Sequence, residues 1–226
     1  MSLIVKICGL SSPEALDIAL EAGADMVGFV FFPPSPRNIS LETARMLGKR
    51  VRERAQKVAL TVDADDAMLE AVVEALQPDV LQLHGKELPG RVAALRQKFG
   101  RLVMKAIAVE TKADLSAMEA YGGVADRLLF DARPPREATR PGGLGRAFEW
   151  QLLRNLEPGM PFMLSGGLNV GNVSEALRIT RAPGVDVSSG VERAPGEKDL
   201  DMIRAFVRAA REAARSLAAK PVASDA

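Results

Sequence analysis

Residues 3–31, LIVKICGLSSPEALDIALEAGADMVGFVF, decide the fold because they contain a complete strand, helix and strand. Both ends of the stretch are short apolar runs rich in β-branched and aromatic residues, as is typical of buried strands. Between them, Ser12 is a good helix N-cap, Pro13 suits the first helical position and Gly23 lies just past the helix end. The stretch therefore predicts one βαβ unit.

The same alternation continues along the chain. Longer segments between the apolar runs repeat apolar residues at i, i+3, i+4 and i+7, for example over residues 69–76 and 203–210. Because parallel strands need right-handed crossovers, eight consecutive units close into a barrel. We expect a single-domain α/β fold, a (βα)8 TIM barrel, with a doubly wound open sheet as the alternative. The expected strands are residues 3–8, 25–31, 57–62, 80–83, 102–107, 127–131, 161–164 and 185–187, and the expected helices lie near 13–22, 41–52, 66–76, 89–98, 112–120, 147–155, 171–179 and 199–215.

The chain has no internal linker, since no Pro/Gly/Ser-rich stretch separates two hydrophobic sets. We expect a catalytic domain over residues 1–216 and a tail over residues 217–226 that is disordered from Lys220, KPVASDA. The longest irregular segment within the domain is residues 132–145, ARPPREATRPGGLG. A loop of that length is typical of a lid or a binding loop.

The composition disfavours several classes of function. Lysine and arginine number 30 and aspartate and glutamate 29, so no overall field attracts nucleic acid or an acidic membrane. No apolar segment approaches the roughly 18 residues that span a bilayer. The single cysteine, Cys8, forms no intramolecular disulfide, and the single histidine, His84, offers no paired zinc ligands. We therefore expect a cytoplasmic protein without a metal.

The strand ends carry the candidate chemistry, because barrels of this kind place their active site at the carboxyl ends of the strands. The first strand ends at Cys8, the fourth at His84, the sixth at Asp131 and the eighth at Asp186. Side chains alternate along a strand, so Cys8 points inward together with Lys6.

The same rule turns Asp131 inward and leaves Phe130 against the helices, so Asp131 faces Cys8 across the barrel mouth. Each of these two residues also has a purely structural interpretation. A buried cysteine is commonly a small hydrophobic residue. An aspartate at a strand end can cap a helix or pair with a buried lysine, here Lys6 or Lys105.

Glycine-bearing turns follow the late strands. The sixth strand is followed by Gly142, Gly143 and Gly145, the seventh by Gly166 and Gly167, and the eighth by Ser188, Ser189 and Gly190. Exposed backbone N–H groups in such turns bind phosphate without side-chain charge. The last two turns together predict a phosphate site, and the alternative is that the glycines only permit tight turns.

Seven motifs, in order along the chain, resemble those of the phosphoribosylanthranilate isomerase family. Together they extend from residue 4 to about residue 206 and so cover nearly the whole chain. The motifs are VKICGL (5–10), GADMVGFVFFPPSPRNIS (23–40), LQLHG (81–85), LLFDARPP (128–135), LSGGLNVGNV (164–173), VDVSSGVE (185–192) and PGEKD (195–199).

The resemblance implies a role for each matching residue. Cys8 is the general base, Asp131 the general acid, and Arg37 holds the carboxylate of anthranilate. A guanidinium is a planar fork that suits a carboxylate. Further substrate contacts are expected for His84, Gly143, Gly166, Gly167, Asp186, Ser188, Ser189 and Gly190. For His84, a hydrogen-bonded structural role is an equal alternative.

The implied reaction is an Amadori rearrangement of N-(5-phosphoribosyl)anthranilate to 1-(2-carboxyphenylamino)-1-deoxyribulose 5-phosphate in tryptophan biosynthesis. Asp131 protonates the ribose ring oxygen, the ring opens to a Schiff base, and Cys8 removes a proton from the neighbouring carbon. Because no redox step is involved, no cofactor is implied. Cys8 needs a cationic neighbour or N–H donors to reach its thiolate, and Lys6 and Lys105 are the candidate cations.

One residue departs from the family pattern, since Leu144 stands where a hydroxyl residue is common. Three alternatives stay open. An isomerase of histidine biosynthesis would be expected to have a pair of carboxylates, one on strand one and one on strand five. This chain has Cys8 and no acid at those positions. A metal-dependent epimerase would need several histidines, and a noncatalytic barrel would bind the phosphosugar without turnover. We expect a small-molecule phosphosugar as partner and a monomer, with a homodimer as the alternative.

Overall fold

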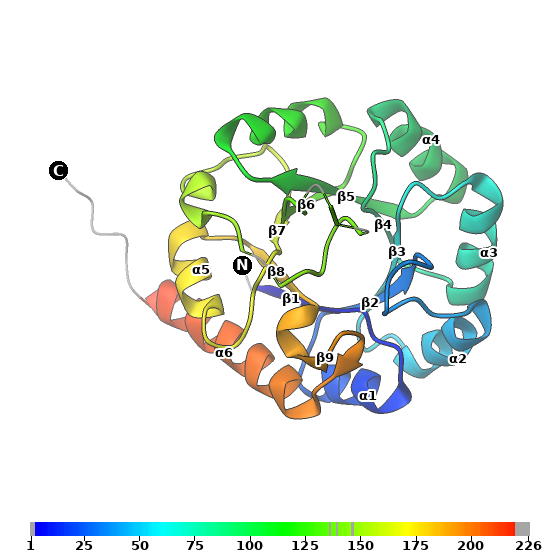
Figure 1. Cartoon of the computed structure of the whole chain (residues 1–226), viewed down its shortest axis with the longest axis horizontal. Coiled ribbons are helices and arrows are strands. Elements are labelled where there is room, and N and C mark those ends of the chain that lie inside the picture. Colours follow the sequence, from blue (N-terminus) through cyan, green and yellow to red (C-terminus); the bar gives the residue numbers. More distant parts are fainter. Residues whose placement is uncertain (1–2, 136, 139, 146, 220–226) are drawn as a thin grey trace.

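The computed structural model describes residues 3–135, 137–138, 140–145 and 147–219, and the chain folds into a closed barrel (Figure 1). Over these residues, eight strands follow one another around the barrel in chain order, with helical segments outside them. The predicted (βα)8 barrel is therefore confirmed. An open doubly wound sheet is excluded, because such a sheet reverses its strand order at one point.

The element bounds agree closely with the expected ranges. The barrel strands are Ile4–Cys8 (β1), Met26–Phe31 (β2), Gln56–Thr61 (β3), Val80–Leu83 (β4), Leu102–Val109 (β5), Arg127–Ala132 (β6), Phe162–Leu164 (β7) and Gly184–Val187 (β8). The α-helices are Pro13–Glu21 (α1), Leu41–Val51 (α2), Asp66–Leu76 (α3), Pro89–Phe99 (α4), Val173–Thr180 (α5) and Leu200–Ala219 (α6).

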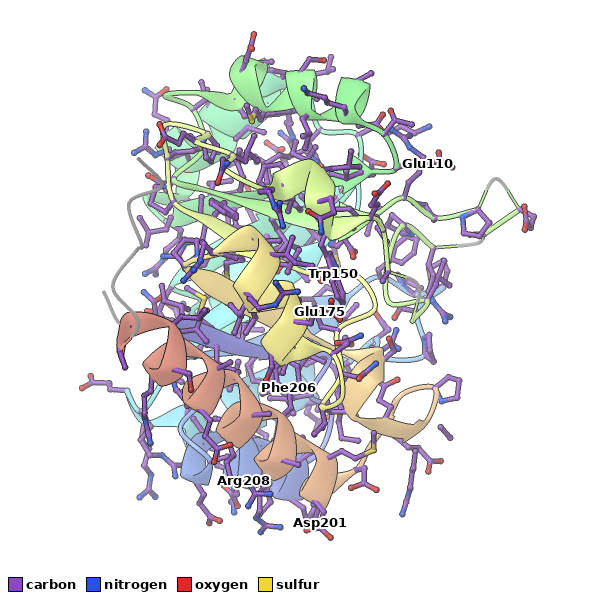
Figure 2. All side chains as sticks on the ribbon, turned by 90° about the vertical axis from the view of Figure 1, so that its left-hand side faces the viewer. Glu110, Trp150, Glu175, Asp201, Phe206 and Arg208 are labelled. Atoms are coloured by element: carbon purple, nitrogen blue, oxygen red, sulfur yellow. The ribbon has the colours of Figure 1, made fainter. Side chains whose placement is uncertain are left out.

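The barrel closes because β1 pairs with both β2 and β8. Lys6 lies beside Met26 of β2 and beside Asp186 of β8, and all neighbouring strands of the barrel run parallel. Parallel strands bring all their carboxyl ends to one end of the barrel. In the side view, Glu110 just after β5 marks this end, from which the long loop segments project (Figure 2).

Side chains alternate between the two faces of the barrel wall, as the strand periodicity predicts. Val5 and Ile7 belong to the core between strands and helices, whereas Lys6 is fully buried inside the barrel. Phe130 likewise packs toward the helices, and Asp131 faces inward. The interior is filled by an apolar cluster of Met26, Val58, Val80, Met104, Ala106, Leu129 and Met163.

Helix ends and apolar stripes follow the sequence rules. The Ser12 side chain accepts a hydrogen bond from the backbone N–H of Ala15, so Ser12 is the N-cap of α1. Phe206 of α6 is fully buried against the barrel, while Arg208, two residues on, lies on the exposed side (Figure 2). The spacing of apolar residues therefore identified the buried face of α6 correctly.

Two expected helices are 3-10 segments. Residues Lys112–Tyr121 form η1, whose packed apolar residues Leu115, Met118 and Tyr121 recur every third position. That period suits a 3-10 helix, in which side chains at i and i+3 are aligned. Only Trp150–Leu153 (η2) is helical in the expected segment 147–155, because Arg154 is extended and Asn155 is left-handed.

Two further features were not predicted. A short antiparallel hairpin, Glu192–Ala194 (β9) and Glu197–Lys198 (β10), follows the 3-10 turn Ser189–Val191 (η3) after β8. Helix α6 extends to Ala219, four residues beyond its expected end. The expected disordered segment from Lys220 lies outside the described residues. Within the ranges given above, no helix is long and apolar enough to cross a membrane.

Candidate active site

A cavity opens at the carboxyl ends of the strands. Its walls come from strand ends on opposite sides of the barrel and from the loops after β6, β7 and β8. Ten of the eleven predicted site residues line it: Cys8, Arg37, His84, Asp131, Gly143, Gly166, Gly167, Asp186, Ser188 and Ser189.

Cys8 lies at the end of β1 and is 4% exposed, and Lys6 and Asp186 are buried on the same inner face of the barrel wall. The Nζ atom of Lys6 lies 3.0 Å from Oδ2 of Asp186, and both side chains are buried. Burial raises the pKa of the Cys8 thiol, and the positive charge of Lys6 lowers it only in part, so the net shift is upward. Burial alone would lower the pKa of Lys6, but Asp186 and Cys8 outweigh it and the net shift is upward.

Asp131 ends β6 and is 5% exposed. Its Oδ1 accepts a hydrogen bond from the backbone N–H of Ala132 at 2.9 Å, and its Oδ2 lies 3.1 Å from Nε2 of His84. Gln82 Nε2 lies 3.2 Å from Nδ1 of the same imidazole. With Gln82 as donor, Nδ1 accepts and the proton is on Nε2, so His84 donates to Asp131.

The structural alternatives for Asp131 are not realised. Lys6 pairs with Asp186, and Lys105 pairs with Glu87 at 3.0 Å. Among the described residues neither lysine contacts Asp131, which instead lines the same cavity as Cys8. Lys105 therefore supports the loop after β4, whereas Lys6 is the cation that lowers the pKa of Cys8 most, with a smaller effect from Lys198.

Arg37 lies in the loop after β2 and is 4% exposed. Its Nε and Nη2 atoms donate to the two carboxylate oxygens of Glu192, each at 2.7 Å, and Nη2 also donates to the carbonyl of Gly143 at 3.2 Å. Arg37 is therefore a buried and paired residue, not a solvated arginine of an exposed loop. The residue is held rigidly at the cavity wall.

The turns after β7 and β8 pack against each other. Gly166 and Gly167 have φ values of 83° and 65°, which L side chains rarely adopt, and in the described structure their N–H groups have no hydrogen-bond acceptor. Gly190 does not line the cavity. A Cβ atom added there would lie 1.8 Å from the carbonyl oxygen of Leu168, so only glycine fits between the two turns.

The loop after β6 covers part of the cavity. A Cβ atom on Gly142 would lie 2.6 Å from Asp131 Oδ2, and one on Gly143 would lie 2.5 Å from Nη1 of Arg37. Leu144 also lines the cavity, at the position where the family commonly has a hydroxyl. This loop therefore approaches Asp131 and Arg37 closely.

Sequence reasoning missed three residues around the cavity. Arg140 lines its wall, and Glu192 and Lys198 hold Arg37 and Ser188 from the β9–β10 hairpin. A signal was present for two of them, because Glu192 ends the motif VDVSSGVE and Lys198 lies in PGEKD. Among the described residues, no group of three or more His, Cys, Asp or Glu side chains is arranged to hold a metal ion.

The fold and the cavity define a (βα)8-barrel enzyme with a thiol and a carboxyl group lining one site at the carboxyl ends of its strands. The family model described as N-(5'phosphoribosyl)anthranilate (PRA) isomerase matches residues 5–209. The chain belongs to this family, and the resemblance found in the seven motifs is confirmed.

Individual proteins agree with this assignment. The N-(5'-phosphoribosyl)anthranilate isomerase of Nitrobacter hamburgensis is 66% identical over 213 residues, covering 94% of this chain and 95% of that protein. The crystal structure of phosphoribosyl anthranilate isomerase from Thermotoga maritima has a TM-score of 0.81 and 35% identity, covering 93% of this chain and 99% of that one. A crystal structure of the isomerase in complex with reduced 1-(o-carboxyphenylamino)-1-deoxyribulose 5-phosphate has a TM-score of 0.78 and 33% identity, with the same coverage.

Proposed function

We propose that this cavity performs the family's reaction, with Cys8 as general base and Asp131 as general acid. The chain is an isomerase of tryptophan biosynthesis that converts N-(5'-phosphoribosyl)anthranilate to 1-(o-carboxyphenylamino)-1-deoxyribulose 5-phosphate. The observation that carries the residue assignment is that a buried thiol and a buried carboxyl group, from β1 and β6, line the same cavity.

The sugar phosphate is held by the turns after β7 and β8. Gly166 and Gly167 supply N–H groups that have no acceptor within the described structure, and Ser188 and Ser189 lie across from them. Backbone donors of this kind bind phosphate without a side-chain charge. Gly190 contributes indirectly, because it lets the two turns pack closely. The phosphate thereby fixes one end of the substrate.

Asp131 starts the reaction by giving its proton to the ribose ring oxygen. The C1–O bond breaks as the lone pair of the amino nitrogen forms the protonated Schiff base. The resulting Asp131 carboxylate keeps two hydrogen bonds, from Ala132 N–H and from His84. Such donors stabilise the anion formed in this step, and a positioned acid contributes about 10²- to 10⁴-fold.

Cys8 completes the rearrangement as a thiolate. It removes the proton from C2, the electron pair moves to form the enolamine, and tautomerisation gives the ketose. Because burial raises the pKa of the Cys8 thiol, the positive charge of Lys6 is needed to keep the thiolate accessible. Asp186 holds Lys6 through Oδ2, while its Oδ1 is buried at the cavity without a partner among the described residues. That oxygen is suited to accept from a sugar hydroxyl.

Arg37 receives the carboxylate of the anthranilate ring. Glu192 occupies the edge formed by Nε and Nη2, so the substrate meets Nη1 and the outer side of Nη2. The carbonyl of Gly143 now accepts from Nη2 at that side, and the substrate carboxylate takes over this contact. Charge-assisted contacts of this kind give both affinity and orientation.

The remaining assignments follow from the same site. The reaction moves protons only, so no cofactor is needed. A lone reduced thiol that has to ionise suits a cytoplasmic setting. We also infer a monomer, because the exposed large hydrophobic residues of the described structure are few and lie in different segments of the chain: Met46, Leu88, Leu102 and Leu200.

The substrate assignment is tested with purified protein by the loss of anthranilate fluorescence on phosphoribosylanthranilate. Turnover is the expected result. A chain that binds reduced 1-(o-carboxyphenylamino)-1-deoxyribulose 5-phosphate but shows no turnover is a noncatalytic binding barrel, and the proposal is then wrong. Faster conversion of the aminoaldose of histidine biosynthesis than of phosphoribosylanthranilate would also contradict it.

A further inference from the structure

The Arg37 guanidinium is held by Glu192, a carboxylate that takes no part in the proton transfers. Its Nε and Nη2 atoms each donate to Glu192 at 2.7 Å, and the two side chains are 4% and 3% exposed. Two parallel hydrogen bonds fix the plane of a guanidinium as well as its position. Nη1 has no hydrogen-bond partner among the described residues and lies against Gly143 at the cavity. The contact with Glu192 therefore determines which edge of Arg37 faces a ligand.

Glu192 is itself held by Lys198, which lies opposite it in the β9–β10 hairpin. Lys198 Nζ donates to Glu192 Oε1 at 2.7 Å and to the carbonyl oxygen of Ser188 at 2.9 Å, and its side chain is 2% exposed. The Ser188 hydroxyl in turn donates to the carbonyl of Cys8 at 3.1 Å. The hairpin thus connects the wall that carries Arg37 with the end of β1.

The charges of this cluster point toward an anionic ligand. Two cations, Arg37 and Lys198, share the carboxylate of Glu192, so positive charge is in excess beside the cavity. Burial lowers the pKa of Lys198 although Glu192 opposes this, and the pKa of Glu192 is lowered because its two cationic partners outweigh burial. Burying an ion pair is seldom more stabilising than packing apolar side chains of the same volume, so stability alone explains the cluster poorly.

We propose that Glu192 is a positioning residue that aims Arg37 at the aromatic carboxylate and so sets the preference for substrates that carry this group. The inference rests on the proposed function. Glu192 does not touch the substrate, because both its oxygens are engaged by Arg37 and Lys198. It acts by holding the guanidinium in one plane, and the lysine keeps Glu192 in place.

The test compares two ligands that differ only in the carboxylate. Reduced 1-(o-carboxyphenylamino)-1-deoxyribulose 5-phosphate and its phenylamino counterpart are titrated against wild type and Glu192→Gln. The wild type is expected to prefer the first ligand. In the variant, the Kd of the phenylamino ligand divided by that of the carboxyphenylamino ligand is expected to fall about tenfold or more, because Arg37 is no longer aligned for its charge-assisted contact with the carboxylate. With phosphoribosylanthranilate, KM rises by a similar factor while kcat stays within about threefold.

Glu197→Gln is the matched control, because Glu197 is an exposed residue of the same hairpin whose carboxylate pairs with Arg193. It is expected to leave both Kd values unchanged. Glu192→Asp keeps the charge and is expected to restore part of the preference, and it replaces Glu192→Gln if that variant does not fold. Wild-type preference in a folded Glu192 variant, or a loss of kcat at unchanged KM, overturns the proposal. A wild type that turns over no phosphoribosylanthranilate refutes the proposed function instead.

Discussion

Replacing Lys6 by methionine removes the main cation that counteracts burial at Cys8 and leaves the weaker effect of Lys198. Lys6 Nζ and Asp186 Oδ2 are 3.0 Å apart in a fully buried position, and the Lys6 charge lowers the pKa of Cys8. Two unit charges about 4 Å apart interact by about 4 kcal/mol at an effective dielectric constant of about 20. The loss of an attraction of this order destabilises the thiolate and so raises the pKa of Cys8. Turnover at neutral pH is then expected to fall by about 10²-fold or more and to recover as the pH rises.

Thiolate absorbance in the ultraviolet measures this directly, because Cys8 is the single cysteine of the chain. The titration and the rising, acid-side limb of kcat/KM are expected to move together to higher pH in Lys6→Met. Since Asp186 is left buried and unpaired, at a cost of about 3–5 kcal/mol, Lys6→Met/Asp186→Asn is measured beside it. The double variant is expected to show a smaller upward shift, because Asp186 raises the pKa of Cys8. An unchanged titration in both folded variants refutes the role of Lys6.

Two further outcomes are expected. Gly190→Ala forces apart the turns after β7 and β8, since its Cβ would lie 1.8 Å from the Leu168 carbonyl oxygen. The affinity of this variant for the reduced product is expected to fall about tenfold or more, and its free energy of unfolding by about 1–3 kcal/mol. Calorimetric titration measures the affinity, with Gly171→Ala as the control. Equal affinities in the two variants would contradict the expectation. The pKa of Glu192 is lowered in the folded state, so its contribution to stability is present above the unfolded pKa of about 4.3 and is lost as the pH falls through the folded value. The free energy of unfolding of Glu192→Gln, measured with denaturant, should therefore depend less on pH between about 5 and 3 than that of the wild type. Equal pH dependence in the two proteins would contradict this expectation.

The barrel could be predicted because the signals for its strands and helices come from residues close together in the sequence. Alternation along β1 and β6 assigned Lys6 and Asp131 to the interior and Phe130 to the helical layer, and the structure agrees. Ser12 and Pro13 marked the start of α1 correctly. Such signals depend on residues close together in the sequence, where backbone geometry alone determines which way side chains point.

The missed features depend on contacts between distant residues. Arg37 and Glu192 are 155 positions apart, and no periodicity indicates that loops after β2 and β8 meet. The 3-10 geometry of η1 was missed because the three-residue spacing of Leu115, Met118 and Tyr121 is compatible with an α-helix as well as with a 3-10 helix. Candidate residues at strand ends were therefore identified from the sequence, whereas the residues that orient them required the structure.

The proposed mechanism requires one thiol and one carboxyl group to act on the same bound sugar. The most direct measurement is the rate of fluorescence loss at saturating phosphoribosylanthranilate for Cys8→Ala and for Asp131→Asn, with binding of the reduced product measured in parallel. Each variant is expected to turn over at least about 10²-fold more slowly while still binding the reduced product. A near-wild-type rate in either folded variant would contradict this mechanism.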